Sequence, residues 1–180
     1  MKKILLVALI AIGICTFSHA QHFSSSKGKA VVGLGMGLPY GGFGGRLSIN
    51  PLDQVALFGG LGYNLVGVGY NVGMQYIVPS EKQAEFFLTA MYGYNAVIKI
   101  KGTNLYNDSY NGVSAGAGLR INSKQNKGMF WDFGVLIPAR SQEYRDDWDR
   151  LNNNQMIENL SKASPVLIFV GLNFPISPRD

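Results

Sequence analysis

The feature that most constrains this chain is a period-two alternation of apolar and small residues. In residues 66–76, valine, tyrosine or methionine occupies every second position, and glycine, asparagine or glutamine fills the positions between them. A strand sends these two sets to opposite faces of a sheet, whereas a helix would scatter both sets around its circumference. The alternation therefore predicts β-strands. It recurs in eight segments, which are residues 32–38, 43–50, 55–63, 66–76, 86–94, 113–121, 131–137 and 166–174.

The two faces of these segments differ in composition. One face is aliphatic and aromatic, and the other is mainly glycine with a few polar residues. Charged residues make up 15% of the chain, well below the roughly 25% that is usual for soluble domains. A soluble barrel with its apolar face inward would need charged residues on its outward positions, and those positions hold mostly glycine, serine and asparagine. The composition favours an apolar face that is turned towards lipid.

Strands in a membrane must close into a barrel, because hydrocarbon offers no partner to an unpaired backbone group. We therefore expect an all-β fold, a closed antiparallel up-and-down transmembrane β-barrel of eight strands. Eight strands leave an interior just wide enough for side chains to fill, which accounts for the glycines on the inward face. A soluble, exported, lipocalin-like carrier of apolar ligands is the alternative.

The first twenty residues have the pattern of a secretory signal peptide. Two lysines precede an apolar run over residues 4–14, and small residues near Ala20 suit cleavage. The run has about eleven residues, whereas a helix needs about twenty to cross a bilayer. We expect residues 1–20 to be removed and residues 21–180 to form a single domain in a bacterial outer membrane. Cys15 leaves with the signal, so the remaining chain has no cysteine.

The expected connections differ between the two ends of the barrel. Compact polar turns follow the second, fourth and sixth segments, and long connections follow the fifth and seventh, over residues 97–111 and 139–165. With both chain ends in the periplasm, the short turns lie there and the two long loops lie outside the cell. We expect a structural or interaction role through these loops, with Tyr106, Tyr110 and Trp148 as contact residues.

The second long loop carries charges of both signs. Asp147 suits the N-cap of a short helix that places Trp148 and Leu151 on one face. The acidic residues around Asp147 lack the glycine-turn spacing of a calcium loop. We therefore expect a solvated loop without a metal site.

Six polar residues fall on the inward face and are the candidates to line the lumen. They can line a narrow pore for small solutes, or they can form an ion-paired plug, because buried charges need partners. The narrow interior of an eight-stranded barrel favours the plug. These residues are Arg46, Asn71, Gln75, Arg120, Asp132 and Asn173.

No catalytic centre is visible in the sequence. The two histidines are His19, in the expected signal, and His22, near the start of the remaining chain, so no histidine is left for the usual general base. We expect no enzyme and no cofactor. Lysine and arginine are scattered without a basic cluster interleaved with aromatic residues, so we expect no nucleic-acid partner. The expected partners are outer-membrane lipid, the barrel-assembly machinery, and an extracellular protein or surface.

The chain resembles the small eight-stranded outer-membrane β-barrel proteins, of the outer membrane protein β-barrel domain or porin-like type. The glycine-alternating segment 32–38 and the closing segment 166–174 carry the resemblance, with the stretch 137–140 ahead of a charged loop. The resemblance implies that assembly machinery recognises the closing aromatic residue, Phe174, although residues 175–180 continue past it. It implies no fixed activity, because members include structural barrels, adhesion proteins, narrow pores and a few enzymes.

Overall fold

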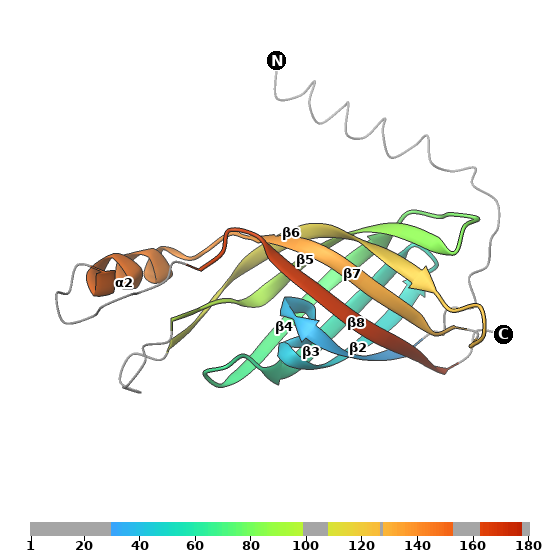
Figure 1. Cartoon of the computed structure of the whole chain (residues 1–180), viewed down its shortest axis with the longest axis horizontal. Coiled ribbons are helices and arrows are strands. Elements are labelled where there is room, and N and C mark those ends of the chain that lie inside the picture. Colours follow the sequence, from blue (N-terminus) through green and yellow to red (C-terminus); the bar gives the residue numbers. More distant parts are fainter. Residues whose placement is uncertain (1–29, 99–107, 127, 153–162, 178–180) are drawn as a thin grey trace, which may run out of the picture.

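A computed structural model describes residues 30–98, 108–126, 128–152 and 163–177. Each strand pairs antiparallel with the next along the chain, and β8 returns to pair with β1 (Figure 1). The closed eight-stranded up-and-down barrel is therefore confirmed, while the expected signal peptide lies outside the described residues. The elements are β1 (Ala30–Gly37), η1 (Leu38–Tyr40), β2 (Gly42–Leu52), β3 (Val55–Tyr63), β4 (Val68–Ile77), β5 (Ala84–Ile98), β6 (Asp108–Asn122), β7 (Phe130–Pro138), α2 (Gln142–Asn152) and β8 (Leu167–Ser177).

The apolar face of the strands lies on the outside of the barrel and the other face lies inside, as the alternation predicted. Along β7, Phe133 and Val135 are exposed on the outside of the barrel, and Asp132 and Leu136 are buried inside it. On β8 the outward Ile168 is 78% exposed. Every strand contributes a large exposed apolar side chain of this kind, namely Leu34, Leu47, Leu61, Val72, Leu88, Leu119, Val135 and Ile168 for β1 to β8.

Several strands are longer than the alternation predicted. β2 runs through Pro51 to Leu52, because a shift in its register with β3 accommodates the extra residues. β8 runs past Phe174 to Ser177, which pairs with Ala30 across a register shift in β1. An irregular register keeps strands paired while it breaks the strict period of two.

The connection between β1 and β2 folds into the barrel and does not form a loop at its rim. Pro39 lies in the first turn of η1, and Gly37 and Gly41 flank it with φ angles of 108° and 70°. These left-handed conformations, which glycine adopts without a steric penalty, let the chain reverse its direction. Tyr40 is completely buried as a result. Leu38, which the alternation placed on the outward face, is also buried inside.

Inward-facing glycines make room for η1. A Cβ atom at Gly171 of β8 would overlap the phenol of Tyr40, and one at Gly60 of β3 would overlap the carbonyl oxygen of Pro39. The inward glycines thus do more than save space in a narrow lumen. They form a recess for the first connection of the chain.

An apolar core surrounds η1 within the lumen. One of its members is Tyr94, which the alternation over residues 86–94 placed on the outward face, but Gly93 has a φ of 151° and the register shifts between Tyr94 and Ala96. These two irregularities turn Tyr94 inwards, where its ring lies against Gly69. The buried members of this core are Leu38, Tyr40, Phe58, Ile77, Phe87, Met91, Tyr94, Leu136 and Phe169.

Candidate functional site

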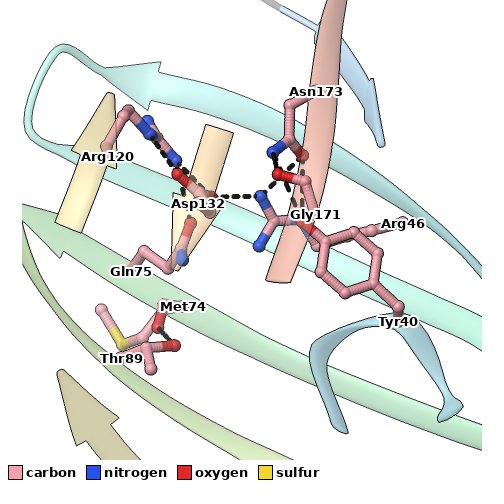
Figure 2. Close-up of polar contacts among 9 residues, drawn as sticks. All are labelled: Tyr40, Arg46, Met74, Gln75, Thr89, Arg120, Asp132, Gly171 and Asn173. Atoms are coloured by element: carbon pink, nitrogen blue, oxygen red, sulfur yellow. Dashed lines mark hydrogen bonds and ion pairs between the residues drawn. The ribbon is translucent and has the colours of Figure 1, made fainter. Parts of the chain in front are cut away.

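One carboxylate inside the barrel binds two arginines from different strands. Asp132 of β7 accepts hydrogen bonds from Arg120 Nε at 2.8 Å and Arg120 Nη2 at 3.0 Å (Figure 2). Arg46 of β2 reaches the same carboxylate from the opposite wall, with Nη2 at 2.7 Å from Oδ2. Arg46 is 2% exposed and Asp132 is 0% exposed. The three side chains therefore span the lumen as one buried ion-paired unit.

Amide and phenol side chains extend this unit towards η1. Arg120 Nη2 donates to the Gln75 side-chain oxygen at 3.2 Å, and Arg46 Nη2 donates to the Asn173 side-chain oxygen at 2.9 Å. Asn173 Nδ2 in turn donates to the hydroxyl of Tyr40 at 3.3 Å (Figure 2). A continuous chain of polar contacts thus joins β4, β6, β7, β2, β8 and η1.

The two guanidinium groups also lie over aromatic rings. The Arg120 Cζ atom is 3.8 Å from the centre of the Phe130 ring, and the Arg46 Cζ atom is 4.9 Å from that of Tyr40. Such contacts partly replace the hydration that a buried cation loses. A further buried carboxylate, Glu85 of β5, pairs in register with Arg120. Among the described residues, the buried charged side chains are therefore two arginines and two acids.

Asn71 of β4 holds the other side of η1. Its Nδ2 atom donates to the backbone oxygen of Leu38 at 2.9 Å and to that of Tyr94 at 3.1 Å. These two acceptors are carbonyl groups where the regular ladder is interrupted, so a side-chain donor satisfies them. The first connection is therefore fixed between Asn71 on one wall and Asn173 on the opposite wall.

The structure buries all six side chains that the sequence placed on the inward face. Five of them belong to the ion-paired unit and its extensions, and the sixth, Asn71, binds η1. Sequence reasoning missed Tyr40 and Glu85. Glu85 is in phase with the inward Phe87, so the alternation carried a signal for it. No periodic signal marked Tyr40, although two glycines directly after it indicated a tight reversal.

A second candidate site rises from one end of the barrel. β5 pairs with β4 only as far as Gly93, and β6 pairs with β7 only from Ser114 onwards. Beyond these points β5 and β6 continue as a two-stranded hairpin, to Ile98 and from Asp108 (Figure 1). The expected loop over residues 97–111 is therefore partly strand, and Tyr106 lies outside the described residues.

Helix α2 packs against this hairpin. The buried residues of their contact are Ala96, Ile98, Tyr110, Tyr144 and Leu151, with Trp148 and Ala163 packed at the edge. The rings of Tyr110 and Tyr144 meet edge to face at 5.4 Å between centroids. Trp148 and Leu151 do share one face of the helix, as the sequence predicted. We call the turn between β3 and β4, the hairpin of residues 94–98 and 108–113, and α2 together the crown.

Two expectations for the crown are wrong. Tyr110 was expected in an exposed loop, but it lies in β6 and is 5% exposed because α2 covers it. Asp147 was expected to cap the helix, but α2 begins at Gln142 and Asp147 lies within it. The Ser141 hydroxyl accepts from the backbone N–H of Tyr144 instead, at 3.3 Å. Serine is a preferred cap, and its hydroxyl satisfies a donor that the helix leaves free.

Asp147 has a different role in the crown. Its carboxylate accepts from the Tyr110 hydroxyl at 2.9 Å and pairs with Arg150 at 2.8 Å. Burial raises the pKa of Tyr110 above its ordinary value, and the hydrogen bond to Asp147 and the negative charge of that group raise it further. Tyr110 thus stays a protonated donor that ties the hairpin to α2.

Polar contacts join the remaining parts of the crown. Asn64, in the turn between β3 and β4, donates through Nδ2 to the Ser109 hydroxyl at 3.0 Å. Asn95 Nδ2 donates to the backbone oxygen of Ala139 at 3.0 Å, just ahead of α2. The crown is therefore one hydrogen-bonded assembly that can present a preformed surface.

Within the part of the chain that the structure describes, no helix is long and apolar enough to cross a membrane. The described residues also contain no group of three histidine, cysteine, aspartate or glutamate side chains that could hold a metal ion. No protein-family model matches the chain, and neither a curated protein nor a solved structure matches it. The family resemblance therefore stays a prediction, and the fold and its two candidate sites carry the functional argument.

Proposed function

We propose that this protein is an integral outer-membrane β-barrel with a closed lumen and a structural or interaction role through its crown. The observation that carries this proposal is the inverted polarity of the barrel. Its ion-paired arginines are buried inside, and apolar side chains cover the outside of every strand. Monomeric soluble proteins rarely expose apolar patches larger than a few hundred Å². Hydrocarbon would surround the same surface without an energetic penalty.

Strand length and aromatic placement support the membrane assignment. Strands β2 to β8 have nine to fifteen residues and meet the requirement of about 9–11 residues for a tilted crossing, and β1, with eight residues, is about one residue shorter. Exposed Phe86 and Trp131 lie towards the end with the short turns, and exposed Tyr63 and Tyr92 lie towards the crown. Aromatic side chains favour the two membrane interfaces, where one part of the ring is apolar and another stays hydrated. The predicted signal peptide supplies the export that this location requires.

The filled lumen disfavours the two alternatives. A pore needs a continuous water path, and an apolar-ligand carrier needs an empty interior. Here η1 and the Arg46–Asp132–Arg120 unit occupy the space that either function would use. We propose a non-conducting and non-enzymatic barrel. Planar-bilayer recordings test the first part, and clear single-channel steps from the wild-type protein would overturn the closed lumen.

A charge placed on the outward face tests the membrane assignment. Val135 lies mid-barrel between Ala117 and Ile168, so Val135→Arg puts a cation at the expected bilayer centre. There it costs roughly 2–4 kcal/mol in a membrane barrel. The matched control is Asn152→Arg at the exposed end of α2. We expect the wild type and the control to fold into phosphatidylcholine vesicles and float with them, and Val135→Arg to fold in much lower yield.

A soluble barrel predicts the opposite outcome. The wild type would then be recovered in the aqueous fraction without detergent, and Val135→Arg would raise its solubility. Orientation is tested separately with single cysteines at Asn152 in α2 and Glu81 in a short turn. A membrane-impermeant thiol reagent on intact cells should label the first and spare the second, and the reverse result would place the crown on the periplasmic side.

A further inference from the structure

The turn between β3 and β4 contains an unusual backbone conformation. Leu65 has a φ of 75°, and it is the only non-glycine residue with a positive φ among the residues that the structure describes. Residues with a Cβ avoid this region because the Cβ crowds the following carbonyl oxygen, and glycine or asparagine normally takes such a position. Leu65 is nevertheless a large apolar residue, and it is 56% exposed.

Polar contacts on both sides hold this conformation. The Asn64 side-chain oxygen accepts from the backbone N–H groups of Val66 at 3.2 Å and Gly67 at 2.8 Å. The Tyr63 hydroxyl donates to the backbone oxygen of Leu65 at 3.3 Å. A residue persists in a sparsely populated conformation only where its surroundings determine it strongly, and such residues often have a functional role. The turn therefore holds the backbone of Leu65 in one conformation and leaves this apolar residue exposed at the surface.

The surroundings of Leu65 indicate what it contacts. Tyr63, Val68 and Tyr70 are exposed beside it and continue the apolar outer surface of β3 and β4. Residues 54–80 contain no lysine, arginine, aspartate or glutamate. In α2, by contrast, six of the eleven residues are charged. The turn between β3 and β4 thus has the apolar composition of the outer barrel wall, whereas α2 has the charged composition of a solvent-exposed helix.

We propose that Leu65 is an anchor in the interfacial layer of the membrane, in contact with lipid on the crown side of the bilayer. The tyrosines beside it suit this depth, because their hydroxyl groups reach the headgroups while their rings face the acyl chains. The inference rests on the proposed membrane function. It adds that the crown is divided, with the turn between β3 and β4 immersed in the interface and α2 in water.

Single-cysteine variants labelled with an environment-sensitive fluorophore test this division. Three positions are compared in phosphatidylcholine vesicles, each in the full chain with Cys15→Ser. Leu65→Cys is the test position, Leu61→Cys reports the outer wall of β3, and Asn152→Cys reports the water-exposed end of α2. We expect aqueous iodide to quench only the label at position 152. Lipids with a spin label near the headgroup should quench the label at position 65 more strongly than lipids labelled at the chain end.

The outcomes separate the inference from the function on which it rests. If the label at position 65 is as accessible to iodide as the one at 152, while the label at 61 stays shielded, Leu65 is no lipid anchor and the membrane barrel stands. A protein partner at Leu65 would give this same accessible label in vesicles. If the label at 61 is also accessible, the membrane assignment itself fails. Should Leu65→Cys not fold, Val66→Cys repeats the measurement at the neighbouring position of the turn.

Discussion

The lumen and the crown each contain an aspartate that accepts from two donors, and the two sites differ in their surroundings. Asp132 binds two arginines in a site where no partner reaches solvent. Asp147 binds Tyr110 and Arg150, but its side chain is 27% exposed and that of Arg150 is 70% exposed. Water screens the charges around Asp147 and can replace a partner that is lost there. In the lumen, no water reaches Asp132 to replace a lost arginine. We therefore expect the lumen site to contribute more to the free energy of unfolding of the barrel than the crown site.

The largest effect should come from removing the shared carboxylate of the lumen. Asp132→Ala leaves Arg46 and Arg120 buried without their anion, which typically costs about 3–5 kcal/mol. We expect a loss of this size in the free energy of unfolding, measured by urea titration in detergent micelles. Asp147→Ala is the matched control in the crown, with an expected loss of about 1 kcal/mol. Equal losses from the two variants would contradict the difference between lumen and crown.

A smaller loss should follow from filling the recess that holds η1. Gly171→Ala places a methyl group where the phenol of Tyr40 lies, and overpacking of this kind typically costs about 1–3 kcal/mol. Tyr40→Ala removes the obstacle, so the double variant should lose less than the sum of the single losses. The double-mutant cycle measures this coupling. Additive losses would mean that Tyr40 is not seated against Gly171.

The crown should respond less than the lumen to a lost hydrogen bond. Tyr110→Phe keeps the ring against Tyr144 and removes the hydroxyl that binds Asp147. We expect a weakening of about 1 kcal/mol that is confined to the docking of α2. Hydrogen exchange should become faster in α2 and stay unchanged in the barrel strands. A general acceleration throughout the barrel would show that the crown and the lumen form one cooperative unit.

The smallest effect is a pH dependence of the docking of α2. The pKa of Tyr110 is raised above its ordinary value of 10.0 while the crown is assembled. Below about pH 10 the phenol is protonated in both the docked and the released forms, so its hydrogen bond to Asp147 contributes fully to docking. As the pH rises further, the released form ionises first, and docking is progressively lost.

Trp148 reports this release, because it packs at the edge of the contact between α2 and the hairpin. In a Trp131→Phe background, its emission should shift to longer wavelength as the pH is raised above about 10. Tyr110→Phe should remove most of this shift. A shift of equal size in that variant would assign the pH dependence to another group.

The sequence predicted the barrel and its interior better than the crown, for a physical reason. A strand has a period of two, so one correctly assigned face places every inward residue, including Arg46 and Asp132. That inference fails where the period is interrupted. Tyr94 lies between Gly93, with its positive φ, and a register shift, so its position could not be obtained by counting from Tyr92. The segment around Tyr110 had the composition of a loop, but the packing of α2 against the hairpin buries this residue.

The alternation also could not predict that the connection between β1 and β2 folds into the lumen. A short segment between two strands can point towards solvent or into the lumen, and its own residues did not distinguish these paths. The distinguishing residues lie far away in the chain, since Gly60 and Gly171 form the recess for η1. Only the closed arrangement of strands shows that these glycines and Tyr40 meet.

The contact between η1 and β8 has a consequence for the order in which the molecule is made. Tyr40 and Asn173 are 133 positions apart, and Arg46 and Asn173 are 127 apart. Contacts between such distant residues form late, because the intervening chain must be ordered first. Arg46 therefore acquires its full set of partners only when the last strand arrives beside the first. A chain that stops before β8 keeps a charged, unfilled interior, and that defect would distinguish unfinished molecules from complete ones.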